Sequence, residues 1–234
     1  MKLPISNRLR KIAEFVPQGA RVADIGCDHG YLGIHLLLNN VATSVYASDL
    51  NQLPLKTAQK NAVRFGVADR MEFCCANGLA GIRPDSVDTI VCAGMGGEVM
   101  RSILESAPWV KNERYLLLLQ PQSVPHEFRA WLFAEGFSIL EEYPIYEKGH
   151  IYFTMKIRFT GNVTVPTPGM LYLTPQMIQS NSPDLPRYID NVLQNMNKAI
   201  DGMLSTGKSC ERLDFLITAR KEILETRDKN AQCQ

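Results

Sequence analysis

The alternation of short apolar segments with helix-like segments between residues 21 and 136 constrains the fold of this chain more than any other feature. Five apolar segments have the length and composition of buried strands: RVADIG, SVYASDL, MEFCCANG, DTIVCAG and YLLLLQP. Helices are predicted after four of them: YLGIHLLLN, PLKTAQKNAVRFG, GEVMRSILESA and HEFRAWLFAEG. This rhythm predicts an α/β fold with a doubly wound, mostly parallel sheet that helices cover on both faces.

The segment that follows changes the topology at the end of this sheet. Residues 138–159, SILEEYPIYEKGHIYFTMKIRF, predict two antiparallel strands that turn at Lys148 and Gly149. A Rossmann-like sheet that closes with an antiparallel last hairpin after five parallel strands has the class I methyltransferase arrangement. Dinucleotide-binding folds are built from parallel strands, so this ending argues against that class.

Further helices flank the predicted sheet and set the expected domain boundaries. The apolar spacing of residues 5–16 predicts a first helix, and residues 161–182 are rich in Pro, Gly, Ser and Thr, which predicts a linker. Beyond it, residues recur at steps of four and three on either side of a turn at 205–208: Leu185, Ile189, Val192, Met196, Ile200 and Met203, then Leu213, Ile217, Arg220, Leu224 and Arg227. We therefore expect a methyltransferase domain over 1–160, a linker over 161–182 and an antiparallel coiled-coil hairpin over 183–234.

The composition limits the partners of the chain. Lys and Arg number 25 against 24 Asp and Glu, so any contact with nucleic acid must come from local basic patches. The six cysteines form no CxxC pair and no zinc-like spacing with His, so we expect no metal. The sequence has no signal region and no apolar stretch of bilayer length, which predicts a cytoplasmic protein without a membrane partner. We expect a monomer or a weak dimer.

A loop with the sequence GCDHG follows the first predicted strand and carries the clearest chemical signal. Gly26 permits close approach of the backbone, and the helix that starts near Tyr31 directs its amide groups toward a ligand. A nicotinamide-binding loop would read GxGxxG, but Asp28 occupies the position of the second glycine. A carboxylate there repels a pyrophosphate, whereas Asp24 and Asp28 suit the sulfonium and ammonium groups of S-adenosylmethionine.

Polar residues end the next two predicted strands as well. Asp49 lies 23 positions after Gly26 and can accept hydrogen bonds from ribose hydroxyls, and Asn77 ends the strand where an adenine ring would lie. Each residue alone is more often a helix cap or a turn residue, and for His29 a cap and a ligand contact remain equally good interpretations. Together at one sheet edge they predict an S-adenosylmethionine site made of Asp24, Gly26, Asp28, His29, Asp49, Leu50, Asn77, Gly78, Ala93 and Gly94.

Three strings in this order, ADIGCDHGYL, CAGMGGEVM and LLLQPQ, followed by a helical hairpin, resemble the TrmK family of bacterial tRNA (adenine-N1)-methyltransferases. The resemblance covers essentially the whole chain and implies methylation of position 22 in the D-arm of tRNA. The chain departs from the family pattern at three places: Gly33 stands where the family usually has Pro, Asn77 where Asp is usual, and Gln122 where Asn is typical.

The resemblance also explains why the fourth strand ends in a loop with three glycines and no acid or base. Adenine N1 has an in-plane lone pair and no proton to lose, so its methylation requires positioning rather than a general base. We therefore expect catalytic contributions from Asp28, Gly94, Met95 and Gly96, with Asp28 favouring the positive charge as it moves to the base. The alternative is that the glycines only form a tight strand-to-helix turn.

The target base must leave its stack to reach this edge of the sheet. The expected substrate-binding residues are Arg8, Arg10, Tyr31, Gly97, Gln120, Pro121 and Gln122. Two other functions remain open from the sequence: a small-molecule methyltransferase, which would need a lid rather than a helical hairpin, and a non-catalytic RNA- or protein-binding module that keeps the cofactor fold.

Overall fold

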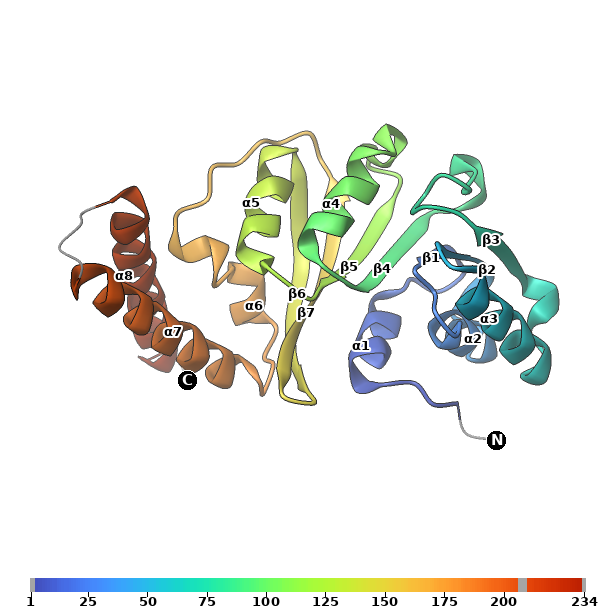
Figure 1. Ribbon diagram of the computed structural model, residues 1–234, viewed down its shortest axis with the longest axis horizontal. Helices are drawn as coiled ribbons and strands as arrows, with labels where there is room; N and C mark the ends of the chain where they lie inside the picture. Colours follow the sequence, from blue (N-terminus) through green and yellow to red (C-terminus); the bar gives the residue numbers. More distant parts are fainter. Residues whose placement is uncertain (1–2, 206–209, 233–234) are drawn as a thin grey trace.

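The computed structural model describes residues 3–205 and 210–232, and its centre is a seven-stranded sheet with the order β3-β2-β1-β4-β5-β7-β6 (Figure 1). The first five strands are parallel, and β7 runs antiparallel to both β5 and β6. The strands are β1 (Ala20–Ile25), β2 (Ala42–Asp49), β3 (Met71–Cys75), β4 (Thr89–Met95), β5 (Leu116–Pro121), β6 (Phe137–Glu147) and β7 (His150–Phe159). The predicted methyltransferase sheet is thereby confirmed.

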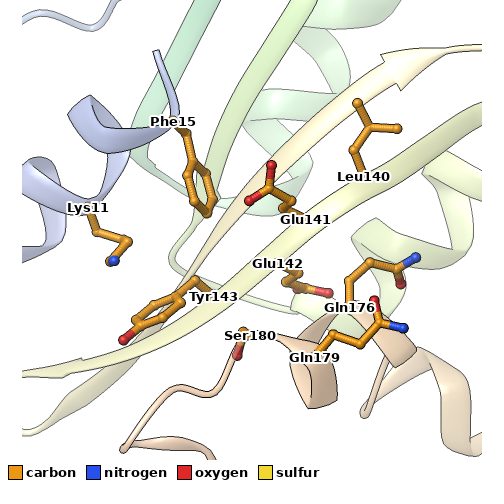
Figure 2. Close-up of a pocket in the computed structure, with 9 residues that line it drawn as sticks. All are labelled: Lys11, Phe15, Leu140, Glu141, Glu142, Tyr143, Gln176, Gln179 and Ser180. Carbon is orange, nitrogen blue, oxygen red and sulfur yellow. The ribbon is translucent and has the colours of Figure 1, made fainter. Parts of the chain in front are cut away.

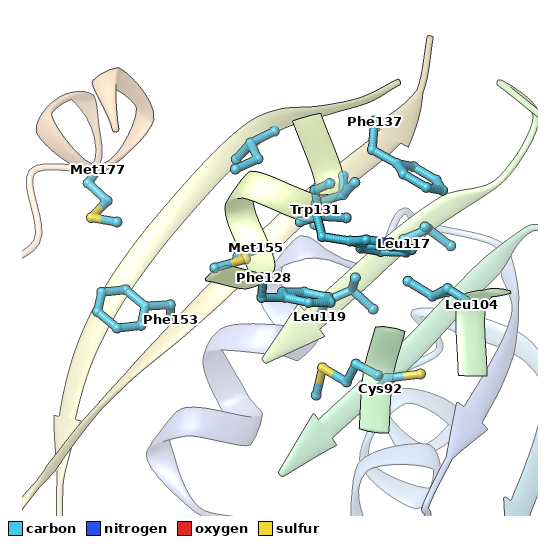
Figure 3. Packing of buried hydrophobic residues seen from close by; sticks show 14 of the residues in the cluster. Cys92, Leu104, Leu117, Leu119, Phe128, Trp131, Phe137, Phe153, Met155 and Met177 are labelled. Atoms are coloured by element: carbon cyan, nitrogen blue, oxygen red, sulfur yellow. The ribbon is translucent and has the colours of Figure 1, made fainter. Parts of the chain in front are cut away.

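Helices cover both faces of the sheet, as the alternation predicted. One face carries α1 (Asn7–Phe15), α2 (Tyr31–Leu38) and α3 (Gln52–Arg64), and the other carries α4 (Gly97–Glu105) and α5 (Pro125–Ala134). Neighbouring residues of β1 point to opposite faces of the sheet. Val22 therefore packs in the first core, beneath α1, α2 and α3, and Ala23 packs in the second core, beneath α4 and α5. Figure 3 shows the second core, where aromatic rings of α5 pack against leucines of β5.

The strand order reverses beside β1, because β2 lies on one side of it and β4 on the other. Open α/β sheets bind ligands at such a switch point, above the carboxyl ends of the strands. The ends of β1, β2 and β4 are therefore the part of the fold that positions a site.

The antiparallel pair β6 and β7 turns at the two residues that the sequence indicated. Lys148 has φ 49° and Gly149 has φ 88°, which is the backbone of a two-residue turn with both central residues in the left-handed region. Glu147 pairs with His150 across this turn. Because β6 runs in the same direction as β5, the turn lies at the same edge of the sheet as the ends of the parallel strands.

The C-terminal helices α7 (Leu185–Ser205) and α8 (Glu211–Gln232) lie at the end of the molecule far from β3, beside α5 and α6 (Pro175–Gln179) (Figure 1). Their apolar residues belong to the same core as the sheet, so they pack on it. The predicted register of α8 is wrong: Ile217 is 37% exposed, and the buried residues are Leu213, Leu216, Ala219 and Ile223. After Leu213, the face of α8 that packs therefore lies one residue earlier along the helix than the recurring steps predicted.

Most of the predicted turn at 205–208 lies outside the described residues. The segment predicted as a linker contains α6 and a short 3₁₀ turn at Gly169–Leu171, and the three domain boundaries stay a prediction.

A fully enclosed ion pair ties this segment to the sheet. Arg129 of α5 and Glu142 of β6 have no exposed side-chain surface, and Nη2 of Arg129 donates to Oε1 of Glu142 at 2.8 Å. Arg129 also donates to the carbonyl oxygen of Leu171 at 2.7 Å, and the hydroxyl of Thr174 donates to Glu142 at 2.8 Å. Each buried charge is therefore satisfied by partners from different parts of the chain.

Candidate active site

Asp24, near the end of β1, is buried without a full set of partners. The residue is 4% exposed, and among the described residues nothing donates to its Oδ2. Burial raises the pKa of this carboxyl from its usual 3.8 to about 7, while the backbone N–H of Gly33 opposes the rise and the charge of Asp49 adds to it. A buried carboxylate oxygen with no donor costs free energy unless a ligand supplies one. Asp24 is therefore the buried group in the described residues that a donor from a ligand would satisfy.

The loop after β1 lies directly against the end of β4. Gly26 has φ +69°, and a Cβ atom at this position would lie 2.1 Å from the terminal methyl of Met95. The left-handed backbone favours glycine at this position, and any side chain there would have to displace the methyl of Met95. The sequence thus brings the predicted cofactor loop and the predicted glycine loop together at the switch point.

Asp49 closes β2 and faces the same loop. Its Oδ2 accepts the backbone N–H of Asp28 at 3.2 Å, and its Oδ1 accepts the backbone N–H of Asn51 at 2.8 Å. Each carboxylate oxygen keeps a lone pair for a further donor. Asp28 has φ 50° and a side chain that is 69% exposed, so the structure fixes its backbone while its carboxylate points to solvent, 3.7 Å from His29.

Other predicted members lie around these acids. The ring of His29 is 5.7 Å from that of Tyr31, the first residue of α2, and Asn77 is exposed after β3. Ser48 donates to the carbonyl oxygen of Gly78 at 3.3 Å. Leu50 is 66% exposed although it is large and apolar. An apolar side chain left uncovered beside Asp49 is suited to contact with a flat ring.

The glycine loop at the end of β4 is approached by side chains from two other elements. Gly94 has φ +79°, and the atoms nearest to a Cβ there would be Nη2 of Arg8 and Nε2 of Gln122, each at 3.5 Å. The backbone N–H of Gln122 donates to the carbonyl oxygen of Met95 at 2.8 Å. Gly96 and Gly97 follow at the start of α4 and face the β5–α5 connection. The surface over Gly94 is thus bounded by one cation and one amide.

Two linked hydrogen bonds, one part-buried and one buried, hold Arg8 in this position. Its Nη1 donates to Oε1 of Gln120 at 2.8 Å, and Gln120, which is fully buried, donates to the hydroxyl of Thr154 at 3.0 Å. The Nε of Arg8 also lies 3.9 Å from the carboxylate of Glu147. Gln120 thus supports Arg8 in this structure, and its predicted role in holding a base stays a prediction. Sequence reasoning missed Thr154 and Glu147, because they lie in strands without a motif.

Two predicted substrate residues occupy other surroundings. Burial, followed by the charge of Arg10, lowers the pKa of His35, which places Arg10 beside α2 rather than with Arg8. Pro121 is buried at the end of β5 and pairs with Met95. Their predicted contacts with a substrate stay predictions.

A hollow of about 410 Å³ lies elsewhere, between α1, β6 and α6 (Figure 2). It is lined by Lys11, Phe15, Leu140, Glu141, Glu142, Tyr143, Gln176, Gln179 and Ser180, and it shares no residue with the predicted site.

The site at the switch point fits the predicted cofactor. Asp24 offers a buried oxygen to a cationic or hydrogen-donating group, Asp49 offers free lone pairs, and Leu50 offers an apolar surface. In the described part of the chain, no group of three or more His, Cys, Asp or Glu could hold a metal ion, and no helix is long and apolar enough to cross a membrane. A sheet of this order, with acids ending β1 and β2 and a glycine loop ending β4, defines a class I methyltransferase.

Comparisons with known proteins agree with this class. Residues 5–155 match the family described as "Methyltransferase domain". The tRNA (adenine(22)-N(1))-methyltransferase of Bacillus subtilis is 32% identical over 151 residues, which cover 64% of this chain and 63% of that relative. The match thus spans less than two thirds of that relative's length.

Solved structures match over nearly the whole chain. A Rossmann-superfamily protein from Streptococcus agalactiae has a TM-score of 0.82 with 29% identity, covering 96% of this chain and 98% of that one. A Streptococcus pneumoniae protein named as a candidate tRNA (m1A22) methyltransferase has a TM-score of 0.80 with 29% identity, covering 94% and 98%. The chain belongs to the methyltransferase-domain family, and the resemblance to the TrmK family is confirmed.

Proposed function

We propose that this protein uses S-adenosylmethionine to methylate N1 of an adenine in the D-arm of tRNA. The single observation that carries the proposal is the loop at Gly94. Its nearest side chains are a guanidinium and an amide, neither of which is a general base at neutral pH. Adenine N1 needs no base, whereas an exocyclic amine would have to lose a proton.

The residues that would hold the cofactor lie on the ends of β1 and β2. Asp24 and Asp49 supply carboxylate oxygens, and Gly26 leaves the space that a side chain would fill. S-adenosylmethionine supplies a methyl group on a positively charged sulfur. A structure of the Streptococcus pneumoniae relative in complex with S-adenosyl-L-methionine, with a TM-score of 0.76, supports this assignment.

The residues around Gly94 would position the base and exclude water. Arg8 and Gln122 flank the loop, and both carry donors that suit the acceptor atoms of a nucleotide. Met95 presents a flexible apolar side chain beside Gly26. Positioning of the base, rather than proton transfer, is the contribution that these side chains can make.

The test is methylation of an unmodified tRNA transcript by the purified protein, followed by nuclease digestion and mass spectrometry of the nucleosides. We expect 1-methyladenosine at one D-arm position, and no product from a matched transcript in which that adenine is guanine. Methylation of the exocyclic amine or of a ribose would contradict the proposal. Turnover of small acceptors with no methylation of tRNA would instead favour a small-molecule methyltransferase.

A further inference from the structure

The turn between β6 and β7 carries three ring-bearing residues and a lysine outside the cofactor site and the glycine loop. We call Tyr146, Lys148, His150 and Tyr152 the β-tip. Figure 1 shows this turn at the lower edge of the molecule, with α1 on one side and the start of α7 on the other. Because β6 runs parallel to β5, the β-tip lies at the sheet edge where β4 ends in the glycine loop.

One face of the β-tip continues the site at Gly94. The guanidinium of Arg8, which lies beside Gly94, is 5.4 Å from the centre of the Tyr152 ring. The ring of His150 is 6.4 Å from that of Tyr152 in an edge-on arrangement. Arg8, Tyr152 and His150 therefore form a row that leads from the glycine loop to the tip of the turn.

The other face of the β-tip reaches the C-terminal helices. Tyr146 lies on the opposite face of the strand pair, is 40% exposed, and has the guanidinium of Arg187 in α7 stacked 4.0 Å from its ring centre. The backbone N–H of Tyr146 donates to Asp184 at 2.8 Å, which fixes the position of this contact. The row of residues that begins at Arg8 thus continues past the tip of the turn, from Lys148 through Tyr146 to Arg187.

The charges along this row favour a polyanion. Its two acids are engaged by the protein, because Glu147 accepts the backbone N–H of Asn7 at 2.8 Å and Asp184 accepts that of Tyr146. The side chain of Glu147 is only 14% exposed, whereas Lys148 and Arg187 are exposed. Exposed cations interleaved with accessible aromatic rings are the surface that binds phosphates and stacks unpaired bases.

We propose that the β-tip, with Arg187, is an RNA-binding element that binds the tRNA along the surface between the glycine loop and the C-terminal helices. The cations contact phosphates on either side of the methylated nucleotide, and Tyr146 stacks on an unpaired base. This inference rests on the proposed function, because it takes tRNA as the substrate. It also gives the chain a specific way to bind RNA although its net charge is only +1.

The test compares a triple variant, Tyr146→Ala, Lys148→Ala and Arg187→Ala, with the wild type and with a matched control. Lys60→Ala serves as the control, since Lys60 is an exposed cation on α3, which lies at the end of the molecule away from the C-terminal helices. The probe is the unmodified tRNA transcript, titrated at several salt concentrations. Affinity for S-adenosylmethionine and the melting temperature are measured on the same samples.

We expect the triple variant to bind tRNA about tenfold or more weakly, and its salt slope to fall by about 1 for each phosphate that the variant no longer binds. Its affinity for S-adenosylmethionine should equal that of the Lys60→Ala control, and its melting temperature should fall by no more than a few degrees, which the loss of the stacking between Arg187 and Tyr146 explains. Tyr146→Phe, which keeps the ring, should bind tRNA as the wild type does.

Wild-type tRNA affinity in the triple variant would overturn the inference and leave the proposed function standing, provided that the wild type methylates tRNA. A wild type that neither binds nor methylates tRNA would overturn both. A triple variant that changes its mass in light scattering, with unchanged tRNA affinity, would also overturn the inference, because the β-tip would then contact a second copy of the chain.

Discussion

Replacing Asp24 with asparagine should stabilise the ligand-free protein at high pH and weaken its binding of S-adenosylmethionine. The substitution keeps the shape of the side chain and removes its charge. Burial raises the pKa of Asp24 from 3.8 in the unfolded chain to about 7 in the folded protein. Between these two values the unfolded chain loses the proton and the folded protein keeps it, so the stability contributed by the wild-type residue is present below pH 3.8 and falls as the pH rises toward 7.

The size of the effect follows from the shift. At pH 5 the carboxyl of the unfolded chain is already ionised, whereas the carboxyl of the folded protein keeps its proton for about two further pH units. This interval corresponds to about 3 kcal/mol of stability that the wild type loses before pH 8. Asparagine has no such reduction. The stability difference between Asp24→Asn and the wild type should therefore change by about 3 kcal/mol in favour of the variant between these pH values. For a chain of this length, that equals a relative rise in melting temperature of roughly 6–12 °C.

The assay is thermal and urea unfolding of both proteins at pH 5 and pH 8, with Asp69→Asn as a control because Asp69 is exposed. Comparing the two pH values cancels any packing effect of the new amide. Calorimetry at pH 6 to 8 should show that wild-type affinity for S-adenosylmethionine increases up to about pH 7, and that Asp24→Asn binds weakly throughout. An equal change in stability at both pH values, or a variant that binds the cofactor as the wild type does, would refute the reasoning.

Three further substitutions test other parts of the structure. Arg129→Met should lower the free energy of unfolding in urea by about 3–5 kcal/mol, because it leaves the buried Glu142 without its cation. Adding Glu142→Gln should recover part of this loss. A loss under about 1 kcal/mol would mean that the pair is not enclosed. Thr154→Val removes the hydroxyl that accepts a hydrogen bond from Gln120, the residue that holds Arg8. We expect kcat/KM for tRNA to fall and cofactor affinity to stay unchanged, and we expect Thr154→Ser to keep the activity of the wild type. Gly26→Ala should destabilise the protein by about 1–2 kcal/mol and weaken cofactor binding, whereas Gly19→Ala, with a similar φ of +83° and open space around it, should affect stability alone.

The strand-helix alternation, the turn at Lys148 and Gly149 and the acids at the strand ends were all readable from the sequence. Each of these features is local: a strand has a period of two residues, a helix has a period of 3.6, and a turn requires particular backbone angles. Parallel strands then place their carboxyl ends at one edge, so Asp24 and Asp49 had to lie near each other once the sheet was predicted.

The register of α8 was not readable in the same way. The sequence offered Ile217 and Arg220 as packing residues, whereas Leu216 and Ala219 are buried. Several apolar faces compete on a helix of this composition, and only the shape of the surface beneath it decides which one packs.

What the sequence alone determined is the class of sheet, the edge where the site lies and the charge that the cofactor must carry. What only the tertiary structure decided is which distant side chains meet there. Arg8 of α1 lies beside Gly94 because it donates to Gln120 of β5, 112 residues away, which in turn donates to Thr154 of β7. Such contacts join parts of the chain with no shared pattern, so they arise only when the packed layers fix each side chain in place.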